Sequence, residues 1–113
     1  MNSSGFIRGI MSKNFDQEKF LLHVGETIEK QLQEWDENYR VNILKMNNYI
    51  FIVKNKEKDY WLEISEQELE KLQHKSPYSL DYLIWTMLAI QGIDIKFGNG
   101  DYLEKVFGIY GRR

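Results

Sequence analysis

The chain has 113 residues, of which 42% are hydrophobic and 14% aromatic, and this composition suits one folded domain and excludes a largely disordered chain. The net charge of −2 gives no case for binding nucleic acid or acidic membranes through overall charge. The chain has no cysteine, which excludes disulfides, thiolate metal sites and a cysteine nucleophile.

The sequence carries no recognisable targeting or membrane-spanning segment. No apolar run approaches the roughly 20 residues that a membrane-spanning helix needs, and the first residues lack the apolar stretch of a secretory signal. We therefore expect a cytoplasmic protein with no membrane partner. The excess of lysine over arginine and the single alanine favour an AT-rich genome, and so a bacterial or phage origin.

The first 13 residues differ in character from the rest of the chain. Residues 1–13 are polar, contain glycine and show no sustained period, so we expect a flexible leader there and a single α+β domain over residues 14–113. Met11 leaves open a second start site.

A helix is predicted over residues 14–37. Asn14 is a suitable N-cap, with Gln17 in the capping-box position three residues later. Apolar residues recur at spacings of three and four, which predicts one buried stripe. Gly25 interrupts this helix, and either a close approach to a sheet or a mild defect explains it. The stripe comprises Phe20, Leu21, Val24, Ile28, Leu32 (or Gln31) and Trp35.

Residues 39–65 predict three antiparallel strands joined by two polar turns. Apolar and polar residues alternate over 39–43 and again over 60–64, as in strands with one buried face. The run from Tyr49 to Val53 is continuously apolar, which predicts a middle strand covered on both faces. Residues 46–48 and 55–58 supply the turns.

Two or three helices are predicted after these strands. Ser65 and Glu68 form a capping box for a short helix that ends near Lys75. Ser76 with Pro77 begins the next helix, which runs to about residue 91 and ends at Gly92. Residues 93–107 fit either a strand followed by a short helix, which we favour, or a hairpin.

The predicted fold class is therefore α+β: an N-terminal helix, a three-stranded antiparallel β-meander, and two to three C-terminal helices packed on the sheet. The expected core comprises Leu21, Val24, Ile28, Val41, Ile43, Phe51, Val53, Leu62, Ile64, Leu80, Leu83, Ile84, Met87 and Leu88.

No group of reactive side chains predicts catalysis. The two histidines, His23 and His74, have no carboxylate or second histidine at ligand spacing. The segment from Asp94 fails as a calcium loop, because Lys96 and Lys105 stand where oxygen ligands are required. We therefore predict no catalytic residue, no metal and no cofactor, and a protein that is not an enzyme.

The predicted function is a small non-catalytic protein-interaction module, such as an adaptor, an inhibitor, or an immunity- or chaperone-like protein. Its partner is another protein or a second copy in a homodimer. Aromatic residues anchor protein interfaces, and this chain has an excess of them near its predicted surface. The candidate partner-binding residues are Tyr60, Trp61, Tyr78, Tyr82 and Trp85.

Two alternative functions remain open. The first is nucleic-acid binding through basic residues of 40–58, and the second is a small-ligand protein or enzyme with a pocket between sheet and helices. The element order resembles double-stranded RNA-binding domains, which carry a basic cluster at the start of their last helix. Here Glu66, Glu68 and Glu70 stand there instead, which makes nucleic acid the lesser option. The candidate nucleic-acid residues are Arg40, Lys45, Lys54, Lys56 and Lys58.

Overall fold

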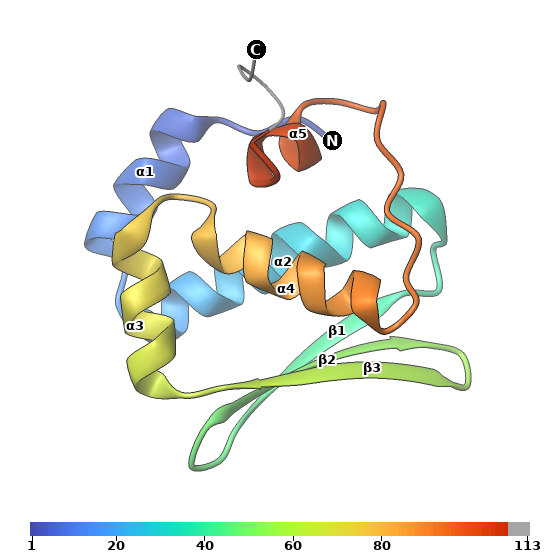
Figure 1. Cartoon of the computed structure of the whole chain (residues 1–113), viewed down its shortest axis with the longest axis horizontal. Coiled ribbons are helices and arrows are strands. Elements are labelled where there is room, and N and C mark those ends of the chain that lie inside the picture. The colour runs from blue at the N-terminus through green and yellow to red at the C-terminus, as the bar shows by residue number, and fades with distance from the viewer. Residues whose placement is uncertain (109–113) are drawn as a thin grey trace.

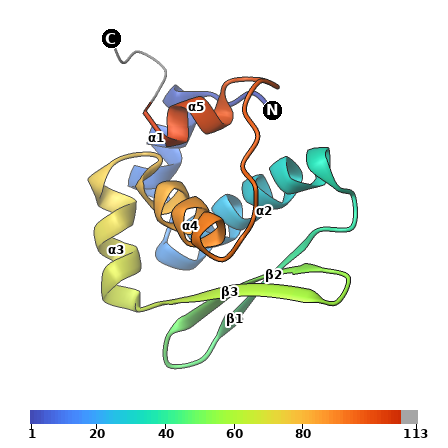
Figure 2. The same cartoon turned by 45° about the vertical axis from the view of Figure 1, so that its right-hand side comes forward.

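The structure is a computed structural model, and it describes residues 1–108. All of its helices lie on one side of a three-stranded antiparallel sheet, so the α+β class is confirmed (Figure 1). Helices α2 and α4 lie over the sheet, and α1 and α5 lie beyond them, farther from the strands (Figures 1 and 2). The elements in chain order are α1 (Gly5–Asn14), α2 (Gln17–Trp35), β1 (Arg40–Lys45), β2 (Tyr49–Asn55), β3 (Lys58–Ile64), α3 (Glu66–Lys75), α4 (Ser79–Ile90) and α5 (Tyr102–Val106).

The sheet has the order β1-β2-β3, with β2 in the centre. Along β2, Tyr49, Phe51 and Val53 are buried against the helices, and the alternate residues Ile50 and Ile52 point away from them. The sequence predicts cover on both faces of this strand. The helices of residues 1–108 cover only one face, which leaves the other without a protein layer.

Residues 1–13, which we expected to be a leader, instead carry most of α1. Ser4 caps this helix, because its side-chain oxygen accepts a hydrogen bond from the backbone N–H of Ile7 at 3.2 Å. Arg8 is buried at 4% exposure, and the Gln73 side-chain amide of α3 donates to the Phe15 carbonyl at 2.7 Å. These contacts join α1 to the C-terminal helices.

Helix α2 begins later than predicted. Asn14 belongs to α1, and Asp16 is the N-cap of α2, accepting from the backbone N–H of Lys19 at 2.8 Å. Gly25 permits the close approach to the sheet that the sequence left open. A Cβ atom built there would lie 2.9 Å from Cδ1 of Ile43, inside van der Waals contact.

The C-terminal half of the chain follows the predicted order with shifted boundaries. Ser65 caps α3 by accepting from the backbone N–H of Glu68 at 3.0 Å, as predicted. Helix α4 begins at Ser79 and not at Pro77, because residues 77 and 78 form a turn. Gly92, with φ of 115°, follows the end of α4, and the N–H of Ile93 donates to the Leu88 carbonyl at 3.0 Å, which is a Schellman motif.

Residues 93–101 differ from both predictions for the tail. They form neither a strand nor half of a hairpin, and the chain runs from α4 to α5 without joining the sheet. The predicted short helix is present as α5. At its start, the Asp101 carboxylate accepts from the backbone N–H of Ser3 at 2.8 Å and makes no cap bond to its own helix.

The core lies between the sheet, α2 and α4, and it extends outward to α5. Ten of the fourteen expected core residues are buried. Val41, Ile43, Leu83 and Met87 are only partly buried. The largest buried side chains that the core prediction missed are Trp85, Tyr102 and Phe20.

Candidate functional site

The uncovered side of the sheet, called the open face below, is defined by strand register and side-chain alternation. Residues opposite each other in the register point to the same side, and their alternate neighbours pack against the helices. The open face comprises Arg40, Asn42 and Leu44 of β1, Ile50, Ile52 and Lys54 of β2, and Asp59, Trp61 and Glu63 of β3.

A continuous apolar strip crosses the open face. Ile52 pairs with Trp61 on β3, and Ile50 pairs with Leu44 on β1, so the four side chains adjoin one another. The outer two remain exposed, with Trp61 at 56% and Leu44 at 48%. Beyond Leu44, Met46 of the β1–β2 turn is also exposed, at 67%.

Charged side chains surround this strip and neutralise one another. Lys54 and Asp59 form an ion pair at 3.7 Å between Nζ and Oδ2. The Asn48 amide donates to Glu63 Oε2 at 2.6 Å, and the Arg40 guanidinium donates to the Glu37 carbonyl at 2.7 Å. Two cations and two carboxylates leave the open face with no net charge.

Side chains from the helices occupy part of both sheet edges. On β1, the backbone N–H of Val41 donates to Glu29 Oε2 at 2.9 Å. On β3, the Gln91 side chain accepts from the Trp61 N–H at 3.0 Å and donates to the Trp61 carbonyl at 2.8 Å. A bonded edge cannot add a further strand at that point, so partner binding by strand addition is disfavoured.

The five aromatic residues predicted to bind a partner do not form one surface. Only Trp61 lies on the open face. Tyr60 points to the helix side, and Tyr82 is half-exposed on α4, with its ring 5.5 Å from that of Phe107. These positions correct the expected single aromatic surface.

Two of these aromatics belong to the interior. Trp85 is fully buried, and its indole Nε1 donates to the Tyr102 hydroxyl at 3.1 Å, so it offers a partner no surface. Tyr78 is partly buried, and its ring lies 4.7 Å below the guanidinium carbon of Arg8.

The five basic residues proposed for nucleic acid are also divided. Arg40 and Lys54 lie on the open face, whereas Lys45 points to the helix side and pairs with Glu66. The hydrogen bond to Glu66 raises the pKa of Lys45. Lys56 occupies the β2–β3 turn, and Lys58 lies opposite Asn55 on the helix side. No continuous basic surface results.

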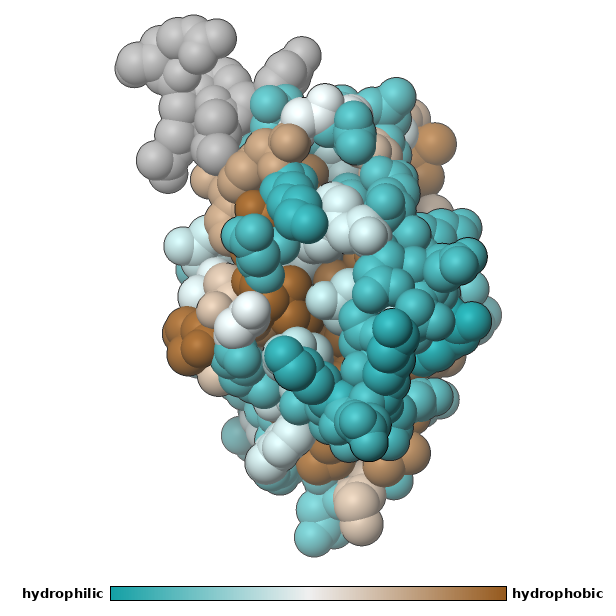
Figure 3. All heavy atoms as spheres, turned by 90° about the vertical axis from the view of Figure 1, so that its right-hand side faces the viewer, coloured by the Kyte–Doolittle hydropathy of each residue, from teal (hydrophilic) through white to brown (hydrophobic). Residues whose placement is uncertain are grey.

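Figure 3 shows that the end of the molecule at the β2–β3 turn is mostly hydrophilic, with apolar areas among the polar ones.

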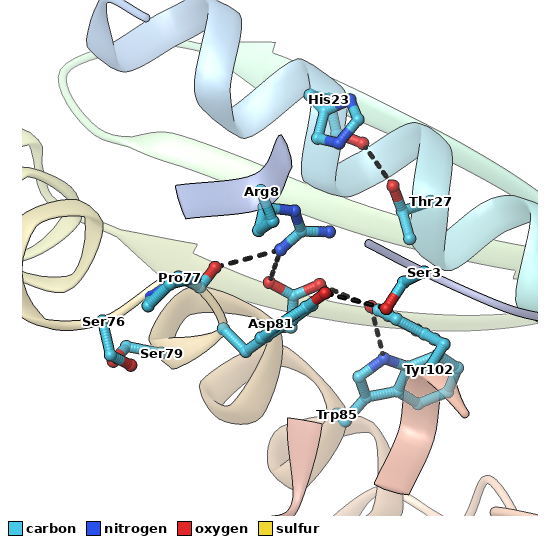
Figure 4. A network of polar contacts seen from close by, with 11 residues as sticks. Ser3, Arg8, His23, Thr27, Ser76, Pro77, Ser79, Asp81, Trp85 and Tyr102 are labelled. Atoms are coloured by element: carbon cyan, nitrogen blue, oxygen red, sulfur yellow. Dashed lines mark hydrogen bonds and ion pairs between the residues drawn. The ribbon is translucent and has the colours of Figure 1, made fainter. Parts of the chain in front are cut away.

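A buried polar network joins α1, α4 and α5 on the far side of the core from the sheet. The Arg8 guanidinium contacts the Asp81 carboxylate and donates to the Pro77 carbonyl at 3.1 Å (Figure 4). The other Asp81 oxygen accepts from the Tyr102 hydroxyl, which itself accepts from Trp85. Asp81 is completely buried.

Burial sets the ionisation of this network. It raises the pKa of the Asp81 carboxyl, and Arg8 and the Tyr102 hydroxyl oppose that rise. Burial and the neighbouring Asp81 raise the pKa of the Tyr102 hydroxyl well above its ordinary value, so Tyr102 stays a donor. The geometry is that of a clamp between helices, in which the Asp81 carboxylate holds the Arg8 guanidinium on one side and the Tyr102 hydroxyl on the other.

Neither a cluster of metal ligands nor a membrane-spanning helix is found in the part of the chain that the structure describes. No group of three or more histidine, aspartate or glutamate side chains in residues 1–108 could hold a metal ion. None of the helices in this part of the chain combines the length and apolar character needed to cross a bilayer. Comparison of the chain with protein-family models, curated proteins and solved structures finds no match.

Proposed function

We propose that this protein is a small non-catalytic protein-interaction module that holds an amphipathic helix of a partner protein on its open face. The observation that carries the proposal is the composition of β2. Its outward residues Ile50 and Ile52 are as apolar as its inward ones, and strands with two apolar faces are typical of sheets covered on both sides.

Size favours a single helix over a second copy of the chain. Strands about 4.8 Å apart, rising about 3.3 Å per residue, give the open face a footprint of roughly 15 by 20 Å, or about 300 Å². A helix is about 10 Å across, and four turns span about 22 Å, so one helix matches the face. A stable dimer buries roughly 800 Å² on each copy, more than twice that footprint.

The chemistry of the open face also favours a helix of a partner protein as its occupant. Trp61 is an exposed anchor of the type that dominates binding energy, and it adjoins the branched side chain of Ile52. The neutral rim does not select a polyanion, which disfavours the nucleic-acid alternative. Bonds from Glu29 and Gln91 at the two edges disfavour an extended peptide as the occupant. With no cysteine to require an oxidising compartment, we place this module in the cytoplasm.

A peptide-display selection tests this proposal. Peptides are selected on the wild-type chain and depleted on the Ile52→Thr/Trp61→Thr variant, which keeps β-favouring residues while removing the strip. We expect enriched peptides with apolar residues at i, i+3, i+4 and i+7, and their binding should shift the backbone amide resonances of Ile50, Ile52 and Trp61.

The matched control is Phe6→Ala/Ile10→Ala, which removes exposed apolar side chains from α1, away from the sheet. It should bind the selected peptides as the wild type does. Peptides of alternating strand pattern would overturn the proposal, as would binding that depends on α1. A dimer in sedimentation equilibrium that the Ile52→Thr/Trp61→Thr change dissociates would instead assign the face to a second copy.

A further inference from the structure

A hollow between the start of α1 and the middle of α2 is separate from the open face. Its volume is about 230 Å³, which leaves room for several water molecules. Its walls combine the buried Arg8 with residues 1–4, side chains of α2, and Tyr78. Those that matter to the argument are Ser4, His23, Glu26, Thr27 and Lys30.

Arg8 brings unused hydrogen-bond donors to this hollow. Both of its hydrogen bonds within residues 1–108 are made by Nη1, to Asp81 and to Pro77. Nη2 and Nε have no partner in this part of the chain, and Nη2 points toward the space between Thr27 and Ser3 (Figure 4). A guanidinium that is 4% exposed and keeps free N–H groups facing a cavity is an arrangement suited to an oxyanion.

Other groups around the hollow also favour binding of an anion. Ser4 Oγ accepts from the Ile7 N–H, which leaves its own hydroxyl proton free to donate. Ser4 is also the N-cap of the ten-residue helix α1, so it stands at the positive end of that helix's dipole. Lys30 adds a positive charge at the rim, and Glu26 is the one carboxylate that lines the hollow.

From this geometry we infer that the hollow binds a phosphate group, held by the free N–H groups of Arg8, the hydroxyl of Ser4 and the ammonium of Lys30. Asp81 lies behind Arg8 and fixes its orientation, so the forked side of the guanidinium is presented ready-made to the ligand. This site does not depend on the function of the open face, because no residue belongs to both.

The two histidines of the chain provide an internal test. His23 lines the hollow, where burial and the charge of Arg8 lower its pKa, and Glu26 and Lys30 also face it. His74 lies on α3, outside the hollow. Inorganic phosphate, phosphoserine and adenosine monophosphate are each added to the folded chain, and both imidazoles are titrated by NMR against a chloride control of equal ionic strength. A bound phosphate dianion should raise the pKa of His23 and leave that of His74 unchanged.

Lys30→Ala should weaken binding about tenfold, the loss expected for one charge-assisted hydrogen bond, while Lys19→Ala on the same helix should not change it. The tightest of the three ligands identifies the source of the phosphate group. Equal pKa shifts at both histidines, no shift at either, or equal losses in the two lysine variants would overturn the site.

Discussion

Replacing Arg8 by methionine tests whether the buried network holds α1 in the fold. The change leaves Asp81 completely buried without its cation. Removing one partner of a buried ion pair costs roughly 3–5 kcal/mol. In a domain of this size each kcal/mol lowers Tm by about 4 °C, so Tm should fall by roughly 12–20 °C.

The same variant should acquire a pH dependence of stability with a definite sign. Burial raises the folded-state pKa of Asp81, and Arg8 opposes that rise, so losing Arg8 raises the pKa further. A raised carboxyl pKa contributes stability that is fully present below the unfolded pKa of about 3.9 and is lost as pH rises through the folded pKa. Arg8→Met should therefore be less stable at about pH 8 than at about pH 5, relative to Arg8→Met/Asp81→Asn, which cannot titrate.

Urea unfolding followed by far-UV circular dichroism measures both effects. Arg8→Met/Asp81→Asn should recover part of the lost stability, because the second change removes the unpaired buried charge. Lys54→Met, which breaks the half-exposed pair with Asp59, should change the midpoint little. Equal unfolding curves for the single and double variants at both pH values would refute the argument that Asp81 is charged, buried and dependent on Arg8.

Two glycines give further predictions, each measured by the same urea unfolding. Gly25→Ala should stabilise the chain by up to about 1 kcal/mol through helix propensity. This gain should appear only in the Ile43→Val variant, which lacks the Cδ1 atom that lies 2.9 Å from the new Cβ. Equal effects of Gly25→Ala in the wild-type chain and in the Ile43→Val variant would refute the close approach. Gly92→Ala meets no atom within 4 Å, yet its φ of 115° should cost about 1–2 kcal/mol, and an unchanged midpoint would refute that strain.

Local signals in the sequence predicted the sheet and most helix positions. Alternation placed the buried face of β3, and the Ser65 cap located the start of α3, because each depends on residues within a few positions of one another. The Asn14 cap was wrong for the same local reason: Asn14 and Asp16 both suit an N-cap, and only the presence of α1 decides between them.

The buried polar network could not be predicted from local sequence patterns, because its members are distant in the chain. Arg8 and Asp81 are 73 positions apart, and each taken alone resembles a surface residue. One signal was available: Asp81 is the one charged residue in the mostly apolar segment 78–91. A lone acid in such a helix needs a buried cation as its partner. The burial of Trp85 followed from the same distant contacts, since Tyr102 of α5 covers it.

The sequence predicted that β2 is apolar on both faces, but it did not predict that one face lacks cover within the chain. Substitutions at two adjacent residues of β2 can separate what the fold requires from what a partner would require. Phe51 is fully buried, so Phe51→Ala should cost roughly 3–5 kcal/mol. Ile52 faces outward, and Ile52→Thr keeps a β-branched side chain, so the isolated chain should lose less than about 1 kcal/mol of cross-strand contact. A small loss would support the proposal that a partner covers Ile52, because the isolated fold would then not need an apolar side chain there. If Ile52→Thr instead destabilises the chain as strongly as a core substitution, the apolar strip belongs to the fold itself, and the case for a docked helix loses its foundation.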